Sequence, residues 1–283
     1  MAPFFLPEEL IVVNAPSARP APGAGVAPFG RAAAYGAELI GTFGLVLFIV
    51  LVLTVSTAAP FGALGPSLAV IGLVHAFVLM LLIAALGSVC GAHFNPAVTI
   101  GLLSARRISL VDACAYIVMQ LVGAVLAVLL VKAFLNGPAT AGGFGAPHVS
   151  GRFLGGSAVK GLVAEAIGTF FLTWAIMGTV VNPRGNRSWG ALVIGATLGL
   201  GVMCIAPLTG AGLNPARAFA PALWGGFGPA GDWLLAYVVG PLAGAVLAAN
   251  VYTLLVLDRL PHGADAEPGA QSAPSGQLGM ARP

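Results

Sequence analysis

Two asparagines and one arginine are the residues with which this sequence could do chemistry on a small molecule. Asn95 and Asn214 each begin the tripeptide Asn-Pro-Ala, and Arg217 follows the second tripeptide directly. An amide side chain donates and accepts hydrogen bonds without carrying charge, whereas arginine is a permanent cation. This set suits a site that orients neutral polar molecules and repels cations.

The segments around the two tripeptides, residues 91–105 and 210–224, are too apolar for ordinary loops. They are also too short to cross a membrane, because ten residues of helix rise about 15 Å, half of a bilayer. Asn is a favoured helix N-cap and Pro is favoured at the first helical position. We therefore expect a re-entrant half-helix to begin at Asn95-Pro96-Ala97 and another at Asn214-Pro215-Ala216. Irregular backbone at membrane depth is tolerated only where it lines a cavity or is buried in protein.

The composition indicates that lipid surrounds the elements that position these residues. Of the 283 residues, 58% are apolar and 7% are charged, against about 25% charged in soluble domains. The twelve cations are scattered along the chain, which argues against a nucleic-acid partner. A membrane span needs about 20 apolar residues. Six stretches meet this length: 36–57, 68–90, 111–131, 158–181, 189–208 and 233–257.

An internal repeat predicts how the six spans are arranged. Glu-x-x-Gly-Thr-Phe occurs at 38–43 and again at 165–170, and each copy is followed by one Asn-Pro-Ala segment. Each copy holds three spans, an odd number, so the second copy must be inverted in the membrane. The predicted fold is an all-α membrane protein with six transmembrane helices and two re-entrant half-helices. The half-helices enter from opposite faces and meet near the midplane with their N-termini together.

These patterns divide the chain into one membrane domain, residues 33–257, and two tails. Repeat 1 covers 33–135 and repeat 2 covers 158–257. Residues 1–32, which have six prolines and no cation before Arg19, and residues 258–283, which are rich in Pro, Gly, Ser and Gln, are predicted to be disordered. If both tails lie on one side of the membrane, eight of the twelve cations lie on that side too. Cations are enriched on the cytoplasmic side, so cytoplasmic termini are predicted. The ten Arg against two Lys, with abundant Ala and Gly, indicate a bacterial source and hence the cell membrane.

Three features of the chain occur together in one known family. They are the paired Asn-Pro-Ala segments, the repeated Glu-x-x-Gly-Thr-Phe and the Arg217 that ends Asn-Pro-Ala-Arg. Over residues 33–257 the chain resembles the aquaporin, or major intrinsic protein, family. The resemblance implies a homotetramer in which every subunit has its own pore. It also implies water as the conducted molecule and no cofactor.

The meeting half-helices would select against ions. Each N-terminus carries roughly half a positive charge, so two of them at the midplane oppose protons and metal ions, a mechanism known for aquaporins. If the carboxamide oxygens of Asn95 and Asn214 cap the half-helices, their NH2 groups remain as donors toward the lumen. A passing water must then offer its oxygen to both amides and cannot relay a proton.

The resemblance also places a selectivity filter, by counting back from the tripeptides, at His75, Val202, Ala211 and Arg217. This set is similar to that of the plant vacuolar-membrane branch and departs from strict water channels. Its small residues imply a wider opening and make ammonia, urea or hydrogen peroxide additional solutes. A glycerol-type facilitator is the alternative, although Ala218 stands where that branch usually has Asp.

Four further residues are expected to support the site. Glu38 and Glu165 occupy matching repeat positions and are expected to accept hydrogen bonds from N–H groups of the half-helix loops. Gln120 is expected to brace the same region, and His93 is expected to pack there. His75 is either a filter residue, giving permeability some pH dependence, or a neutral imidazole bonded to a neighbouring carbonyl.

Two other classes of protein remain as alternatives. An ion-coupled secondary transporter also uses inverted repeats and broken helices, but the midplane here offers amides and no ionisable pair. A membrane enzyme would need a motif such as Gly-x-Ser-x-Gly or His-Glu-x-x-His, and the sequence has neither. Cys90, Cys114 and Cys204 do not follow metal-ligand spacing, so no metal site is predicted.

Overall fold

The computed structural model describes residues 29–57 and 67–260, and every regular element within these ranges is helical. The predicted tails, 1–32 and 258–283, lie almost entirely outside the described residues. Helix α1 begins at Arg31, inside the predicted N-terminal tail. A short 3-10 helix, η5 (Leu257–Arg259), overlaps the start of the C-terminal tail.

Six helices of the described chain are long and apolar enough to span a membrane. They are α1 (Arg31–Thr57), α2 (Leu68–Cys90), α4 (Leu110–Ala141), α6 (Ala158–Ile176) with the π-turn η2 (Met177–Val181), α7 (Gly190–Thr209) after η3 (Arg187–Trp189), and the run α9 (Ala230–Leu234), η4 (Leu235–Val239) and α10 (Gly240–Leu255). Two shorter elements, η1 (Gly143–Gly145) and α5 (Gly151–Leu154), lie between α4 and α6. The six predicted spans are confirmed.

Helix α4 is longer than predicted, running to Ala141 where the hydropathy pattern ended at residue 131. Lys132 lies within the helix, and its ammonium lies 5.5 Å from the centre of the Trp224 ring, a cation–π contact. Pro138 is accommodated after a kink at Leu135, whose φ of −126° and ψ of 31° are non-helical. The proline is thus accommodated by a kink and does not end the helix.

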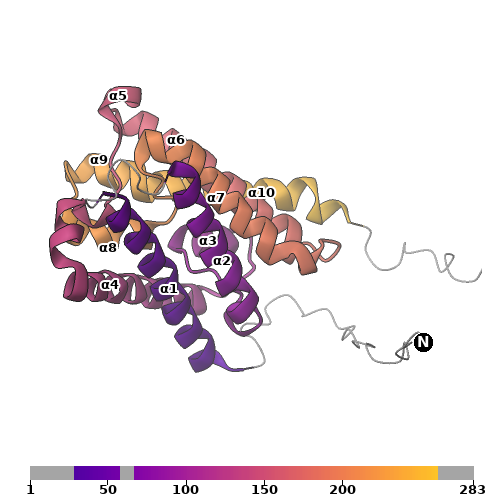
Figure 1. Ribbon diagram of the computed structural model, residues 1–283. Helices are drawn as coiled ribbons and strands as arrows, with labels where there is room; N and C mark the ends of the chain where they lie inside the picture. Colours follow the sequence, from indigo (N-terminus) through magenta and orange to yellow (C-terminus); the bar gives the residue numbers. More distant parts are fainter. Residues whose placement is uncertain (1–28, 58–66, 261–283) are drawn as a thin grey trace, which may run out of the picture.

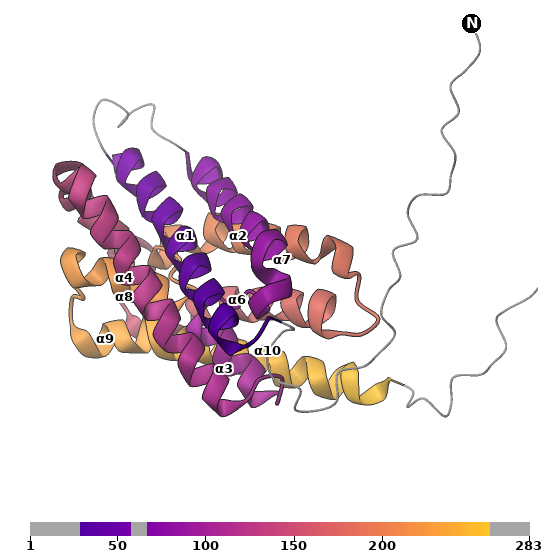
Figure 2. The same cartoon turned by 90° about the horizontal axis from the view of Figure 1, so that it is seen from below.

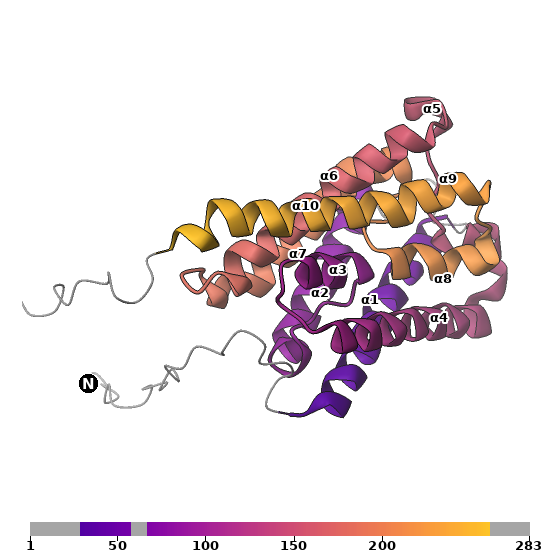
Figure 3. The same cartoon turned by 180° about the vertical axis from the view of Figure 1, so that it is seen from behind.

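The two predicted half-helices are present as α3 (Pro96–Ser104) and α8 (Pro215–Gly225). Each begins with proline at its first position and asparagine as its N-cap, as these residue types favour. Figure 3 shows α3 and α8 between α4 and α10. They lie inside the helical assembly, which is the arrangement that membrane depth requires of a broken helix.

The packing follows the inverted repeat. Helix α1 packs along α4 in the first half and α6 packs along α10 in the second, while α2 and α7 join the halves (Figures 1 and 2). Gly123 of α4 and Gly244 of α10 make equivalent contacts: a Cβ on Gly123 would collide with the Leu39 carbonyl, and one on Gly244 with the Ala166 carbonyl. Only glycine permits these close helix crossings, which are typical of membrane proteins.

The outer faces of the spans are apolar. Large side chains such as Phe48, Leu81, Phe171 and Leu200 are between 52% and 63% exposed. In water such a surface would favour aggregation, but in a bilayer it contacts acyl chains.

Candidate functional site

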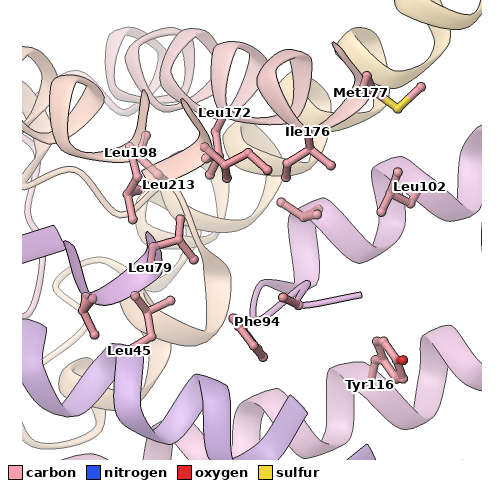
Figure 4. Packing of buried hydrophobic residues seen from close by; sticks show 14 of the residues in the cluster. Leu45, Leu79, Phe94, Leu102, Tyr116, Leu172, Ile176, Met177, Leu198 and Leu213 are labelled. Atoms are coloured by element: carbon pink, nitrogen blue, oxygen red, sulfur yellow. The ribbon is translucent and has the colours of Figure 1, made fainter. Parts of the chain in front are cut away.

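A cavity with about 460 Å³ of empty space lies between the long helices and the two half-helix segments. One part of its wall is apolar and comes from the long helices. Figure 4 shows Leu45 of α1, Leu79 of α2, Leu172 of α6 and Leu198 of α7 converging on this region. The other part is polar and comes from the two half-helix segments, through Ala92, His93, Asn95, Ala211, Gly212, Asn214 and Arg217. The cavity therefore has one side that offers hydrogen bonds and one that does not.

The two N-cap asparagines meet across the repeat axis. Asn95 Oδ1 accepts from Ala97 N at 2.9 Å, and Asn214 Oδ1 accepts from Ala216 N at 2.9 Å. Asn95 Nδ2 donates to the Leu213 carbonyl at 2.9 Å, and Asn214 Nδ2 donates to the Phe94 carbonyl at 2.8 Å. The expectation that the whole NH2 group of each asparagine faces the lumen is therefore wrong, because one N–H of each amide bonds to the opposite loop. One N–H of each amide is left for the cavity.

The loops leading into the half-helices have strained backbone. Ala92 and Phe94 have φ of 51° and 47°, and the equivalent Ala211 and Leu213 have 48° and 50°. This left-handed region costs a non-glycine residue roughly 1–2 kcal/mol. Such conformations persist only where surrounding contacts hold them.

Two buried carboxylates provide those contacts. Glu38 accepts from the backbone N–H groups of His93 and Phe94, both at 2.8 Å. Glu165 accepts in the same way from Gly212 at 2.8 Å and Leu213 at 2.5 Å. Both glutamates are 0% exposed, and carboxylate acceptors make the stronger class of hydrogen bond.

The glycine of Glu-x-x-Gly makes room for a second contact between the motif and each loop. It lies about one helical turn after the glutamate. A Cβ on Gly41 would collide with the Phe94 ring, and one on Gly168 would collide with Leu213. The motif thus holds each loop twice, through its amides and through the side chain that precedes the asparagine.

The polar groups behind the loops differ between the repeats. In repeat 1, Gln120 Nε2 donates to Glu38 Oε2 at 2.8 Å. In repeat 2, Thr209 Oγ1 donates to Glu165 Oε1 at 2.6 Å. Tyr116 and Tyr237 take the same role in both halves, each donating at 2.7 Å to the carbonyl five residues before the tripeptide. No pattern in the sequence predicts this role for the two tyrosines.

Three of the four filter candidates line the cavity together: His75, Ala211 and Arg217. Arg217 is 3% exposed, its Nη1 donates to the Gly145 carbonyl at 3.1 Å, and its Nε has no partner in the described part of the chain. His75 Nδ1 lies 2.8 Å from the Ile71 carbonyl. Both side chains are therefore anchored to backbone at the end of the cavity where α2 begins.

Val202 is not among the cavity-lining residues. Of the described residues of α7, Ile194 and Leu198 line the wall, and Leu198 is one turn before Val202. Counting along the sequence places a residue along a helix, but it does not settle which face of the helix looks inward. No signal marks Leu198 in a helix that is apolar throughout.

His93 has a larger part in the site than the predicted packing role. It lines the central cavity and also a wider vestibule, with about 1,500 Å³ of empty space, beyond the other end. Ala92, Val98, Ile176 and Ile194 line both spaces as well, so the two spaces adjoin. Exposed Arg107 and Arg187 lie on the vestibule wall.

No cluster of three or more His, Cys, Asp or Glu that could hold a metal ion occurs in the described residues. Cys90 is buried, and Cys114 and Cys204 are exposed, with no disulfide among them. The polar groups of the cavity are amides, backbone, one arginine and two histidines, which suit neutral hydrogen-bonding molecules.

Together, the fold and the site define a membrane channel built from an inverted repeat. The pattern of the family described as Major intrinsic protein matches residues 28–252. The chain belongs to this family, and the resemblance drawn from its motifs is confirmed.

Curated relatives come from different branches of life. Aquaporin AqpM of Methanothermobacter thermautotrophicus is 39% identical over 246 residues, covering 77% of this chain and 95% of the relative. Aquaporin TIP4-4 of Zea mays is 39% identical over 221 residues, covering 76% and 83%. Glycerol uptake facilitator protein-like 6 of Lactiplantibacillus plantarum is 37% identical over 222 residues, covering 76% and 94%.

A solved structure has the same fold. The X-ray structure of the aquaglyceroporin from Plasmodium falciparum superposes with a TM-score of 0.69 at 22% identity, covering 81% of this chain and 98% of that one. The predicted fold class is confirmed by this likeness together with the helical architecture.

Proposed function

We propose that this protein is a passive channel for water and small neutral solutes such as ammonia, urea or hydrogen peroxide, and that it excludes protons and ions. The observation that carries the proposal is the pair Asn95 and Asn214, whose amides are bonded to each other's loops and line the central cavity together. Each amide keeps one N–H for a passing molecule. A water that accepts from both must turn its hydrogens toward the two ends of the passage.

Ion exclusion is supported by the charges that face the passage. The N-termini of α3 and α8 both point to the centre, and each contributes a partial positive charge. Arg217, anchored through Nη1 to Gly145, adds a full charge on the side where α2 begins. A cation entering from that side meets the arginine first and the helix ends next.

We propose His75, Ala211 and Arg217 as the filter, with Val202 as a fourth member whose contribution is tested in the Discussion. Ala211 leaves space that a larger residue would fill, which supports passage of solutes wider than water. A glycerol-type facilitator is the second candidate function, because one relative carries that name.

We further propose that the chain forms a homotetramer with one pore in each subunit. Its place is the cell membrane, with both termini in the cytoplasm. The apolar outer faces support insertion. The arginines at the α1 entry, the α3–α4 connection and the α6–α7 connection support the orientation.

Stopped-flow light scattering on proteoliposomes tests the function. Gradients of water, urea, ammonia and glycerol should give fluxes that rise linearly with the gradient, with fast water and slow glycerol. Leu81→Ala, which alters only an exposed lipid-facing side chain, is the control for insertion. Saturable uptake that depends on an ion gradient would instead establish a transporter, and glycerol flux matching that of urea would favour the facilitator.

A further inference from the structure

An apolar groove lies between α4 and the run of α9, η4 and α10, and the two half-helices form its floor (Figure 3). Ile117 of α4 and Val238 of η4 lie on opposite walls, and Phe219 of α8 lies below them. All of the lining residues are apolar or aromatic, and the groove has about 1,130 Å³ of empty space. Exposed Leu234 is part of the lining, so the groove opens at the surface. An apolar groove at membrane depth is expected to hold hydrocarbon and not water.

The groove has the length of one acyl chain. From Trp233 to Leu242, which both line it, the helical run rises about 14 Å at about 1.5 Å per residue. Its inner part is lined by Pro96 and Pro215, the first residues of the half-helices, whose N-termini meet inside the assembly. Half of the hydrocarbon core of a bilayer is about 15 Å thick. The groove therefore matches a chain that reaches from one surface of the bilayer to its middle.

A polar pocket adjoins the groove at the end of the spans. It has about 600 Å³ of empty space and lies between the connection from α4 to α6 and the connection from α8 to α9. Phe227 and Trp233 line both the pocket and the groove. Two exposed ionisable residues, His148 and Asp232, line the pocket, and no Lys or Arg of the described chain does. The pocket thus offers a carboxylate without a neighbouring permanent cation in its wall.

Trp233 stands at the boundary of the two spaces and has an unused donor. It is 6% exposed, and its Nε1 has no hydrogen-bond acceptor within the described part of the chain. A buried indole N–H usually has a partner, and the lack of one costs free energy. Tryptophans at the ends of membrane spans lie at the level of the lipid headgroups. The ester carbonyl of a phospholipid, which joins the headgroup region to the acyl chains, is an acceptor at this level.

We propose that the groove and the pocket together bind an ethanolamine phospholipid. One acyl chain lies in the groove, an ester carbonyl accepts from Trp233 Nε1, and the ammonium of the headgroup pairs with Asp232. The phosphate stays at the open side of the pocket, which His148 lines. The site goes beyond the proposed function, because it does not depend on what the channel conducts.

Charge complementarity selects this headgroup. A carboxylate with no Lys or Arg in the same wall attracts an ammonium and repels the net negative charge of a phosphatidylglycerol headgroup. The ammonium of ethanolamine also donates charge-assisted hydrogen bonds to a carboxylate. The quaternary ammonium of choline has no N–H and makes none.

Native mass spectrometry of the full-length protein in detergent, with added lipid, counts the phospholipids bound to each subunit. Phosphatidylethanolamine, phosphatidylglycerol and phosphatidylcholine with the same palmitoyl and oleoyl chains are titrated separately. We expect phosphatidylethanolamine to bind at one molecule per subunit and more tightly than the other two lipids. Equal binding of all three would indicate ordinary annular lipid and would overturn the proposal.

Asp232→Asn and Trp233→Phe test the two polar contacts. Asp232→Asn should lower the affinity for phosphatidylethanolamine about threefold, the effect of an exposed ion pair. Trp233→Phe keeps an aromatic ring without the N–H and should lower the affinity for all three lipids about fivefold, the effect of one hydrogen bond. Asp258→Asn and Trp189→Phe, at exposed positions near the opposite ends of the spans, are the matched controls. Unchanged affinity in Asp232→Asn would overturn the choice of headgroup, and unchanged affinity in both variants would overturn the site.

Val238→Trp fills the groove, and Val239→Trp is its control. The two residues are neighbours in η4, but Val238 lines the groove, whereas exposed Val239 does not. Val238→Trp should abolish the tight binding of phosphatidylethanolamine, and Val239→Trp should retain it. If Val238→Trp does not assemble, Ile117→Phe fills the groove from α4. Tight binding with the groove filled would overturn the position of the acyl chain.

The proposed function fails separately, because the counting of bound lipids does not measure flux. Protein that binds phosphatidylethanolamine as expected but conducts no water would overturn the channel and leave the lipid site. A conducting channel without preference among the three lipids would overturn only the lipid site.

Discussion

Asn95 and Asn214 are each bonded to the loop that carries the other: Asn95 Nδ2 donates to the Leu213 carbonyl and Asn214 Nδ2 donates to the Phe94 carbonyl. One carboxamide therefore caps its own half-helix, ties down the opposite loop and still has an N–H for the passage. The same side chain therefore stabilises the fold and contacts the passage. The backbone of each loop is held in addition by the glutamates Glu38 and Glu165.

Asn214→Asp separates these duties. Aspartate keeps the capping oxygen but loses the donor to the Phe94 carbonyl and places a carboxylate against it. We expect the free energy of unfolding to fall by about 1–3 kcal/mol and water flux to fall with it. Thermal unfolding in detergent and stopped-flow flux measure the two effects. Asn186→Asp, at an exposed position, is the matched control, and equal behaviour of both variants would refute the cross-bond.

Gly41→Ala tests the notch in α1 that receives Phe94. The added Cβ would collide with the Phe94 ring, whereas a Cβ on Gly36 of the same helix would meet nothing within 4 Å. We expect Gly41→Ala to destabilise the protein by about 1–3 kcal/mol and to lower water flux. Gly36→Ala should be neutral or stabilising by up to about 1 kcal/mol. Similar unfolding temperatures for the two variants would show that the notch is not needed.

Glu165→Gln should be more damaging than Thr209→Val. Glu165 accepts from the Thr209 hydroxyl and from two backbone amides, and Gln offers one oxygen and turns its NH2 toward donors. We expect a loss of about 2–3 kcal/mol, since hydrogen bonds to charged groups exceed neutral ones. Thr209→Val removes one of the three donors and should cost less. Chemical unfolding of both variants gives the order, and the reverse order would contradict the role of Glu165 as the principal acceptor.

These contacts mark the boundary of what the sequence could predict. The six spans and the two half-helices follow from local rules, since hydropathy, an Asn cap and a Pro at the first helical turn act within a few residues. The repeat added the inversion, because an odd number of spans per copy allows no other arrangement.

Contacts between residues distant in the chain could not be predicted in the same way. Asn95 and Leu213 are 118 residues apart. The inverted repeat predicts that the half-helix N-termini meet, but no pattern specifies that the Asn95 amide bonds to the Leu213 carbonyl. The cation–π contact of Lys132 with Trp224 joins α4 to the half-helix α8, 92 residues further along the chain. Such features belong to the packed molecule.

His75→Phe tests the filter from the α2 side. His75 lines the cavity beside Arg217, and Phe offers neither a nitrogen nor the same space. We expect urea and ammonia flux to fall relative to water flux, and any pH dependence of permeability that arises from His75 to disappear. Flux of each solute at several pH values measures both effects. Unchanged urea and ammonia flux would remove His75 from the filter.

The α7 wall gives a sharper test, because sequence counting and the structure name different residues. Counting from Asn214 places Val202 in the filter, yet Leu198 lines the cavity and Val202, 2% exposed, does not. Leu198→Ala should widen the passage and raise urea and glycerol flux relative to water. Val202→Ala removes less volume from a buried site away from the passage, so it should lower stability by about 1 kcal/mol while leaving the flux ratios unchanged.

The two variants share one helix and one type of substitution, so insertion and assembly affect both alike. If Val202→Ala changes the urea-to-water ratio and Leu198→Ala does not, then Val202 turns inward when the channel conducts, and the filter has the four members that the motif spacing predicts.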